Sequence, residues 1–492
     1  MSSADPAAAV RPRRRRRLLL AALATLLVGA LVTTVLLVLE RREAAVVRTG
    51  GEPGLGDPYF PRAGNSGYDV DRYAIELDLG AGNGSLTGTT TFVARATTDL
   101  AWFWFDLALD VASVSVDGAP AVVGRDGLSD VRVQPAEPVR AGQEFTVRVD
   151  YAGTPAEVGG DDAPVYREGE EWSVLGEPEA SAWWFPANDH PSDPALVDVS
   201  VRVPAGVEAV SVGRLESRDT ADEAGFDTWR WVASQPMATY LAFVTVGQYR
   251  LEQGVEDGRP FVHAVSEQLP ERQQEAALAQ LRTSGATVRV LESMFGPYPF
   301  SELGGVVPSA SLGFGALENQ TRPVYDADAI TDPEFAPELL AHELAHMWFG
   351  DNVTLAAWDD IVNSEGWASW AQWAVVERTG GRSAADAFAA TYRRVRDEPE
   401  FWATSLADPG ADNLFETVYT RGPMALQALR TVIGDEAFFA FARDWGSTPG
   451  SRSFEEWTVA AQATTDVDLA PFFEAWYSAP NAPRPSPELG FP

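Results

Sequence analysis

The sequence predicts a multidomain α+β protein in which a β-rich part precedes a mostly helical part, both following an N-terminal membrane helix. Three observations predict this class. Residues 18–39 form an apolar run, residues 61–250 repeatedly alternate apolar and polar positions, and apolar residues after about 251 recur at steps of three and four. At 492 residues, the chain is longer than one ordinary domain.

The N-terminal segment combines a basic block with an uncharged stretch. Residues 1–17 carry Arg11 and Arg13 to Arg17, and residues 18–39 contain no charged side chain. An apolar stretch of this length can span a bilayer as a helix, and the basic flank places the N-terminus in the cytoplasm. We therefore predict a single-pass anchor in the cell membrane, with the rest of the chain outside the cytoplasm. The alternative is a secreted protein with a cleaved signal peptide, whose apolar region is usually shorter, about 7–15 residues.

A linker and a β-rich domain are predicted next. Residues 40–60 are assigned to the linker because Gly and Pro recur between Gly50 and Pro58. Residues 61–250 are assigned to the β domain because period-2 segments alternate with turns that carry Gly, Pro or Asp. The clearest predicted strands are Tyr73 to Leu79, Thr89 to Ala96, Phe145 to Tyr151, Val197 to Val203 and Tyr240 to Tyr249.

The third part, residues 251–479, has mainly helical periodicity and precedes a Pro-rich tail at 480–492. A short β segment is expected from Gly304 to Leu312. The predicted helices lie near 274–295, 334–350, 365–378, 383–396, 421–432, 435–444 and 454–463.

Composition excludes some classes of function. The formal net charge is −34, which argues against nucleic-acid binding because phosphate contacts need clustered basic side chains. Cysteine is absent, so the fold has no disulfide framework.

The run His342-Glu343-Leu344-Ala345-His346, followed by Glu365, is typical of a catalytic zinc site. Residues four apart share one helix face, so His342 and His346 can present imidazole nitrogens to one metal ion. Glu343, one step round the helix, can act as general base on a water molecule at the metal. Glu365 supplies a third, oxygen ligand. Three protein ligands leave the fourth position of one Zn²⁺ open, as catalytic rather than structural zinc requires.

An ordinary polar helix face is the alternative explanation of this run. The chain has only four histidines, and Leu344, Ala345 and Trp348 surround the pair with apolar side chains. Buried imidazoles need polar partners. A metal ion satisfies that need, which favours the zinc interpretation.

A second motif, Gly315-Ala316-Leu317-Glu318-Asn319, lies upstream, and His346 and Glu365 are separated by 18 residues. With these two motifs the chain resembles the gluzincin aminopeptidases, the family that includes aminopeptidase N. The family signature is Gly-x-Met-Glu-Asn, and Leu317 replaces the Met here. The resemblance covers roughly residues 60 to 480. It implies a saddle-like antiparallel β domain, a thermolysin-like catalytic domain and a cleft between them, in a short two-domain form.

The resemblance also implies an activity and residue roles. The chain would be a zinc aminopeptidase that hydrolyses the N-terminal bond of peptide substrates. Glu318 would bind the free α-amino group, with Gly315 and Ala316 beside the substrate, and Tyr419 would donate a hydrogen bond to the oxyanion. Glu177 falls where a Gln often helps to bind the amine, and its carboxylate would add negative charge there.

Two residues depart from the family pattern: Ser364 stands where Asn is usual, and Arg421 stands where Lys is common. Three alternative functions stay open. They are a zinc endopeptidase, another hydrolase on this fold such as an epoxide hydrolase, and a binding ectodomain with an idle site. An idle site predicts loss of a ligand or of Glu343, and none is lost.

Overall fold

The computed structural model describes residues 49–491 apart from 81–83, 161–162, 221 and 223. The predicted basic segment and membrane helix at 1–39 lie outside the described residues. Within the described part of the chain, no helix has the length and apolar character needed to cross a membrane. Residues from Thr49 onward form one compact unit.

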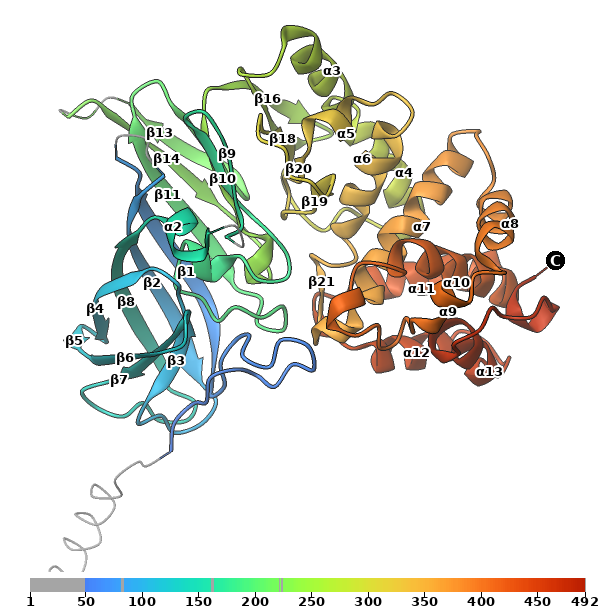
Figure 1. The fold of residues 1–492 in the computed structure, drawn as a ribbon, viewed down its shortest axis with the longest axis horizontal. Coiled ribbons are helices and arrows are strands. Elements are labelled where there is room, and N and C mark those ends of the chain that lie inside the picture. The colour runs from blue at the N-terminus through green and yellow to red at the C-terminus, as the bar shows by residue number, and fades with distance from the viewer. Residues whose placement is uncertain (1–48, 81–83, 161–162, 221, 223, 492) are drawn as a thin grey trace, which may run out of the picture. The chain divides into compact units, whose positions relative to one another are not determined.

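The β-rich part is built on an eight-stranded sheet with the order β13-β14-β11-β1-β2-β8-β4-β5 (Figure 1). Central strand β1 pairs antiparallel with β2 and parallel with β11. Burial alternates along β2, so one face of the sheet packs against the core. The strands are β1 (Tyr68–Asp78), β2 (Leu86–Ala96), β4 (Asp110–Val116), β5 (Ala119–Pro120), β8 (Glu144–Gly153), β11 (Leu196–Pro204), β13 (Arg214–Asp219) and β14 (Phe226–Val232).

Two smaller sheets complete this part. One has the order β3-β7-β6 and the other β12-β15-β10-β9. Their strands are β3 (Phe103–Asp106), β6 (Val122–Asp126), β7 (Asp130–Gln134), β9 (Val165–Glu168), β10 (Glu171–Val174), β12 (Glu208–Ser211) and β15 (Val244–Gly247), with the short helix α2 (Pro155–Gly159) between β8 and β9. The strand predicted from Tyr240 to Tyr249 is wrong in its first part, where a 3-10 turn occupies Thr239–Leu241. This run is almost continuously apolar, so it lacked the alternation that identifies a strand.

A five-stranded sheet with the order β16-β17-β18-β20-β19 follows. Its strands are β16 (Tyr249–Glu256), β17 (Arg259–Ser266), β18 (Leu303–Val307), β19 (Ala316–Leu317) and β20 (Val324–Tyr325). Helical structure therefore starts later than the predicted position of about 251. Asp257 and Gly258 have φ values of 51° and 80°, the conformation of a type I′ turn, which joins β16 and β17 into a hairpin.

The rest of the chain is mainly helical (Figure 1). The helices are α3 (Glu271–Leu281), α4 (Ser284–Phe295), α5 (Ala327–Thr331), α6 (Ala336–His346), α7 (Val362–Arg378), α8 (Ala384–Val395), α9 (Pro399–Ala403), α10 (Val418–Ile433), α11 (Asp435–Gly446), α12 (Phe454–Gln462) and α13 (Ala470–Phe473). A two-stranded pair, β21 (Val353–Leu355) with β22 (Gly450–Arg452), lies among them. The single helix predicted at 274–295 is two helices. The hydroxyls of Thr283 and Ser284 donate to the carbonyls of Gln280 and Leu281 at 2.7 and 2.6 Å, and such local bonds compete with helix continuation.

Part of the predicted linker at 40–60 is packed against both domains. Asp57 is 4% exposed. Its carboxylate accepts hydrogen bonds from the backbone amides of Tyr59 and Trp358, both at 2.8 Å. The Tyr59 hydroxyl donates to Asp408 at 2.5 Å. From Thr49 onward this segment is therefore part of the folded unit, and its polar groups are satisfied by both side-chain and backbone partners.

The Pro-rich tail also packs against the helices. The Tyr392 hydroxyl donates to the Pro483 carbonyl at 2.6 Å, and the Trp476 indole donates to the Leu489 carbonyl at 3.0 Å. The Phe491 ring stacks on Trp476 with centroids 5.8 Å apart. These contacts fix the tail beside α8.

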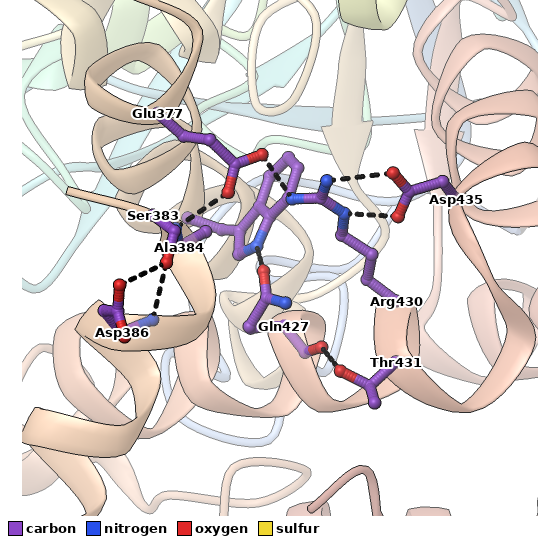
Figure 2. Close-up of polar contacts among 9 residues, drawn as sticks. Glu377, Ser383, Ala384, Asp386, Gln427, Arg430, Thr431 and Asp435 are labelled. Carbon is purple, nitrogen blue, oxygen red and sulfur yellow. Dashed lines mark hydrogen bonds and ion pairs between the residues drawn. The ribbon is translucent and has the colours of Figure 1, made fainter. Parts of the chain in front are cut away.

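A polar clamp of five residues joins the C-terminal halves of α7 and α10 (Figure 2). The residues are Trp370, Glu377, Gln427, Arg430 and Asp435. Arg430 on α10 donates to Glu377 on α7 at 2.9 Å and to Asp435 at the start of α11 at 2.8 Å. Gln427 accepts a hydrogen bond from the Trp370 indole at 3.1 Å. The clamp fixes α7 against α10, the two helices that supply Glu365 and Tyr419.

Candidate zinc and substrate site

Helix α6 presents both histidines of the motif on one buried face. Pro337 lies in its first turn, a position proline favours because the amide there has no helical partner. The imidazoles of His342 and His346, one turn apart, have ring centroids 4.8 Å apart. Both side chains are buried, as is Glu343 between them.

Glu365, in the first turn of α7, reaches both histidines. One carboxylate oxygen, Oε2, lies 3.1 Å from His342 Nε2 and 3.5 Å from His346 Nε2. A ligand atom from each of these three residues lies within 4.8 Å of the others. Burial acts to raise the pKa of Glu365, but the two neighbouring imidazoles outweigh it, so that the pKa lies well below its ordinary value.

This donor set fits Zn²⁺. Two imidazole nitrogens and one carboxylate oxygen are the ligands of many catalytic zinc sites. Both Nε2 atoms converge on the same carboxylate oxygen, and both Nδ1 atoms make hydrogen bonds elsewhere. The site therefore offers three converging ligand atoms from dry surroundings, as a tightly bound metal requires.

Glu343 points into the same space. One of its carboxylate oxygens, an oxygen of Glu318 and a nitrogen of His346 lie within 4.8 Å of one another. Burial raises the pKa of Glu343 well above its ordinary value, with the negative charges of Glu318 and Glu365 adding to the effect and His346 opposing it. A carboxylate in these surroundings is suited to accept and return a proton.

Tyr419 reaches the site from the first turn of α10. Its hydroxyl donates to the second oxygen of Glu365, Oε1, at 3.2 Å. Helices α7 and α10 approach closely at Gly366 and Gly422, because a Cβ atom at Gly422 would lie 2.9 Å from the Gly366 Cα. Glu365 directly precedes Gly366, and Tyr419 lies almost one turn before Gly422. The glycine contact thus determines the separation of these two functional side chains.

Glu318 faces the metal ligands from the loop that follows β19. Gly315 has a φ of +95°, a conformation that favours glycine, and Ala316 begins β19. The Glu318 carboxylate is 3% exposed and accepts a hydrogen bond from the Tyr240 hydroxyl at 3.0 Å. Burial raises the pKa of Glu318, and the positive charge on His346 counteracts it.

Glu177, in the segment that follows β10, adds a further carboxylate. Its Oε1 atom is buried and has no hydrogen-bond partner among the described residues. Burial raises its pKa well above the ordinary value, and the charge of Glu318 is the next largest cause. A carboxylate whose pKa is raised by a neighbouring carboxylate forms with it a suitable place for an ammonium group.

The structure brings together seven of the residues that sequence analysis selected, namely His342, His346, Glu365, Glu343, Tyr419, Glu318 and Glu177, and it adds three. Gly315 and Ala316 lie just before Glu318 in the chain. The Tyr240 hydroxyl bonds to Glu318. Ser364 Oγ lies 2.9 Å from His346 Nδ1, and Gln372 Nε2 lies 3.2 Å from His342 Nδ1. Ser364 carried a signal, because it precedes Glu365 and departs from the family pattern. Gln372 lies two helical turns after Glu365, and no local pattern pointed to Tyr240.

Comparison with known proteins supports a peptidase fold. Residues 280–476 match the domain described as "Peptidase family M1 domain". Aminopeptidase N of Acetobacter pasteurianus is 32% identical over 197 residues, which cover 38% of this chain and 54% of that protein. Leucyl aminopeptidase of Saccharolobus solfataricus is 23% identical over 356 residues, 65% of this chain and 42% of that protein. The chain therefore spans about half the length of these relatives.

Solved structures match more of the chain. A mutant M1 zinc metallopeptidase from Deinococcus radiodurans, bound to a Tyr-Ser-Ala substrate, has a TM-score of 0.77 at 28% identity. The match covers 89% of this chain and 100% of that one. A two-domain M1 zinc metallopeptidase mutant bound to L-tryptophan has a TM-score of 0.78 at 28% identity, over 88% of this chain and 100% of that one. The β-rich part and the helical part together thus have the architecture of a two-domain M1 peptidase.

Proposed function

We propose that this chain, whose residues 280–476 form a Peptidase family M1 domain, is a zinc aminopeptidase that removes the N-terminal residue from peptides. One observation carries the proposal. The buried Glu318 carboxylate lies within 4.8 Å of both the proposed general base Glu343 and the ligand His346. A substrate ammonium held by Glu318 therefore has its first peptide bond beside the metal. The aminopeptidases among the relatives support the same activity.

Zinc would be held by His342, His346 and Glu365, and when bound it supplies a Lewis acid that polarises the scissile carbonyl and acidifies water. Glu343 accepts the proton of the attacking water and passes it to the leaving amine. The position of Glu343 supports this role, because its carboxylate lies within 4.8 Å of His346 and of Glu318. The Tyr419 phenol is neutral and donates a hydrogen bond to the developing oxyanion.

The substrate is recognised by residues other than the zinc ligands. Glu318 and Glu177 hold the α-ammonium, and the Tyr240 hydroxyl orients Glu318. The backbone of Gly315 and Ala316 runs beside the substrate chain. An ammonium entering these buried surroundings needs carboxylate partners, so a peptide without a free amine binds poorly.

The test compares free and N-acetylated peptides of the same sequence, with and without a zinc chelator. We expect kcat/KM to favour the free amine by roughly 10²–10³-fold, because a buried charge pair that loses one partner costs on the order of 3–5 kcal/mol. Glu318→Ala should erode this preference while zinc content stays whole. The isosteric Glu318→Gln is the control that keeps side-chain shape and removes only the charge.

Two outcomes would contradict the proposal. Equal cleavage of free and blocked peptides by the unmodified protein would assign it to the endopeptidases. Chelator-sensitive hydrolysis of another bond, such as an epoxide, without peptide cleavage would indicate a different hydrolase on this fold.

We further propose that residues 18–39 anchor the enzyme in the cell membrane with its catalytic part outside the cytoplasm. The support is the uncharged stretch and the preceding arginine block. Protease added to intact cells should release an active fragment that begins after about residue 43 and before the folded unit that starts at Thr49. Activity found only inside the cell would contradict this topology, and a mature N-terminus just after the apolar run would indicate signal cleavage.

A further inference from the structure

The Nδ1 atom of His346 has two polar neighbours, on the side of the ring that faces away from Glu365. Its Nδ1 atom lies 2.9 Å from the Ser364 hydroxyl oxygen and 3.1 Å from the Phe349 carbonyl oxygen. The Ser364 hydroxyl also donates to the same Phe349 carbonyl at 3.1 Å. Three groups therefore form a closed triangle of hydrogen bonds.

The donor and the acceptor of each hydrogen bond in this triangle follow from the number of protons available. A carbonyl oxygen can only accept, and a serine hydroxyl has one proton. That proton goes to Phe349, so Ser364 turns a lone pair toward His346. Both neighbours of Nδ1 are then acceptors, and Nδ1 must carry hydrogen. In the neutral imidazole this leaves the lone pair on Nε2, the atom that faces Glu365.

The triangle is closed to water. His346 and Ser364 are each 1% exposed. Gly350, with a φ of +122°, makes the space for it, because a Cβ atom there would lie 2.5 Å from Ser364 Oγ and 3.2 Å from His346 Nδ1.

The other histidine has no such constraint. His342 Nδ1 lies 3.2 Å from the side-chain amide of Gln372. An amide can present either its oxygen or its nitrogen by turning about one bond. Gln372 therefore adapts to either tautomer of His342 and selects neither.

We propose that Ser364 is a positioning residue for the metal centre, which acts with the Phe349 carbonyl to hold His346 with Nε2 free for the metal. Ser364 is not among the three proposed zinc ligands, and it acts through His346. The inference rests on the proposed zinc site and assigns a role to the serine that stands where relatives usually carry Asn. It also explains the need for glycine at position 350.

The test measures zinc affinity of the full chain by competition with a chromophoric chelator. Loss of a hydrogen-bond partner behind a metal ligand typically weakens binding about 10–100-fold, and we expect this for Ser364→Ala. Ser369→Ala is the matched control, since Ser369 lies on the same helix, is similarly buried and has no hydrogen-bond partner for its hydroxyl among the described residues. Zinc affinity of this control should stay within about twofold of that of the unmodified protein.

A second readout follows the imidazole N–H protons of the zinc-loaded protein by NMR, which is practicable because the chain has four histidines. Ser364→Ala should shift one N–H signal, and Gln372→Leu should shift a different one, assigning the two ligands. Unchanged zinc affinity in Ser364→Ala, or an equal loss in Ser369→Ala, would overturn the inference and leave the proposed function standing. Failure of the unmodified protein to bind zinc would instead remove the proposed function itself.

Discussion

The two halves of the site are built in different ways. The metal half comprises His342, His346, Glu365, Glu343 and Tyr419, and all of its side chains come from α6, α7 and α10. The recognition half comprises Glu318, Glu177 and Tyr240, which come from a loop and two segments of the β-rich part, spread over the chain from position 177 to position 318.

The metal-ligating carboxylate and the recognition carboxylates also differ in the direction of their pKa shifts. In the metal half, the imidazoles keep the pKa of Glu365 low despite its burial. In the recognition half, burial raises the pKa values of Glu318 and Glu177, and no arginine makes an ion pair with either among the described residues. In the proposed function, a zinc ion completes the metal half and the substrate ammonium completes the recognition half.

The comparison predicts that substitutions in the metal half lower the rate of the chemical step. The largest expected effect is at Glu343. Glu343→Gln should keep the fold and zinc, because the side chain is isosteric and is not a ligand. Turnover should fall by at least about 10²–10⁴-fold, since the amide cannot accept the proton. Single-turnover kinetics and metal analysis of the same preparation check this. Turnover like that of the unmodified protein would remove Glu343 as the base.

Tyr419→Phe should have the next largest effect. Loss of one oxyanion donor costs on the order of 10²–10³-fold in kcat, with little change in KM. The hydroxyl also donates to Glu365 at 3.2 Å, so zinc affinity must be measured beside kcat. A fall in zinc affinity that accounts for the whole loss of rate would show that Tyr419 supports a ligand and does not serve the oxyanion.

The two halves also differ in how far the sequence predicts them. The metal half depends on local geometry, because the spacing of His342 and His346 becomes a shared helix face once a helix is predicted. Glu318, Glu177 and Tyr419 needed the family resemblance. Tyr240 lay within a segment assigned to a strand, and its contact with Glu318 spans 78 positions in the chain.

The same contrast holds for the fold. The helices predicted at the positions of α6, α7, α8, α10, α11 and α12 occur close to where they were expected, because their apolar residues recur at helical steps. The short helix α9 was not predicted. The hairpin of β16 and β17 was missed although Asp257-Gly258 is a strong local turn signal. The packed segment around Asp57 could not be predicted, because its polar groups are satisfied by distant residues such as Trp358.

The smallest expected effect is at Tyr240. It distinguishes the two halves, because it should change substrate binding without changing zinc affinity. Tyr240→Phe removes one hydrogen bond from Glu318 and leaves the ring in place. Hydrogen bonds to charged groups contribute about 1.5–3 kcal/mol, so KM for a free peptide should rise roughly 10–10²-fold. Zinc affinity and the slow cleavage of N-acetylated peptide should not change, because neither depends on Glu318.

Tyr249→Phe provides the matched control for this variant. Tyr249 is likewise buried, at the start of β16, and its hydroxyl lies 2.7 Å from that of Thr245 on β15. An equal rise of KM in both variants would mean that loosening the β-rich part, rather than losing the bond to Glu318, weakens binding. A fall in kcat without a rise in KM in Tyr240→Phe would place Tyr240 in the metal half. If KM rises only for free amines and only in Tyr240→Phe, recognition depends on a carboxylate whose orientation is set from the other domain.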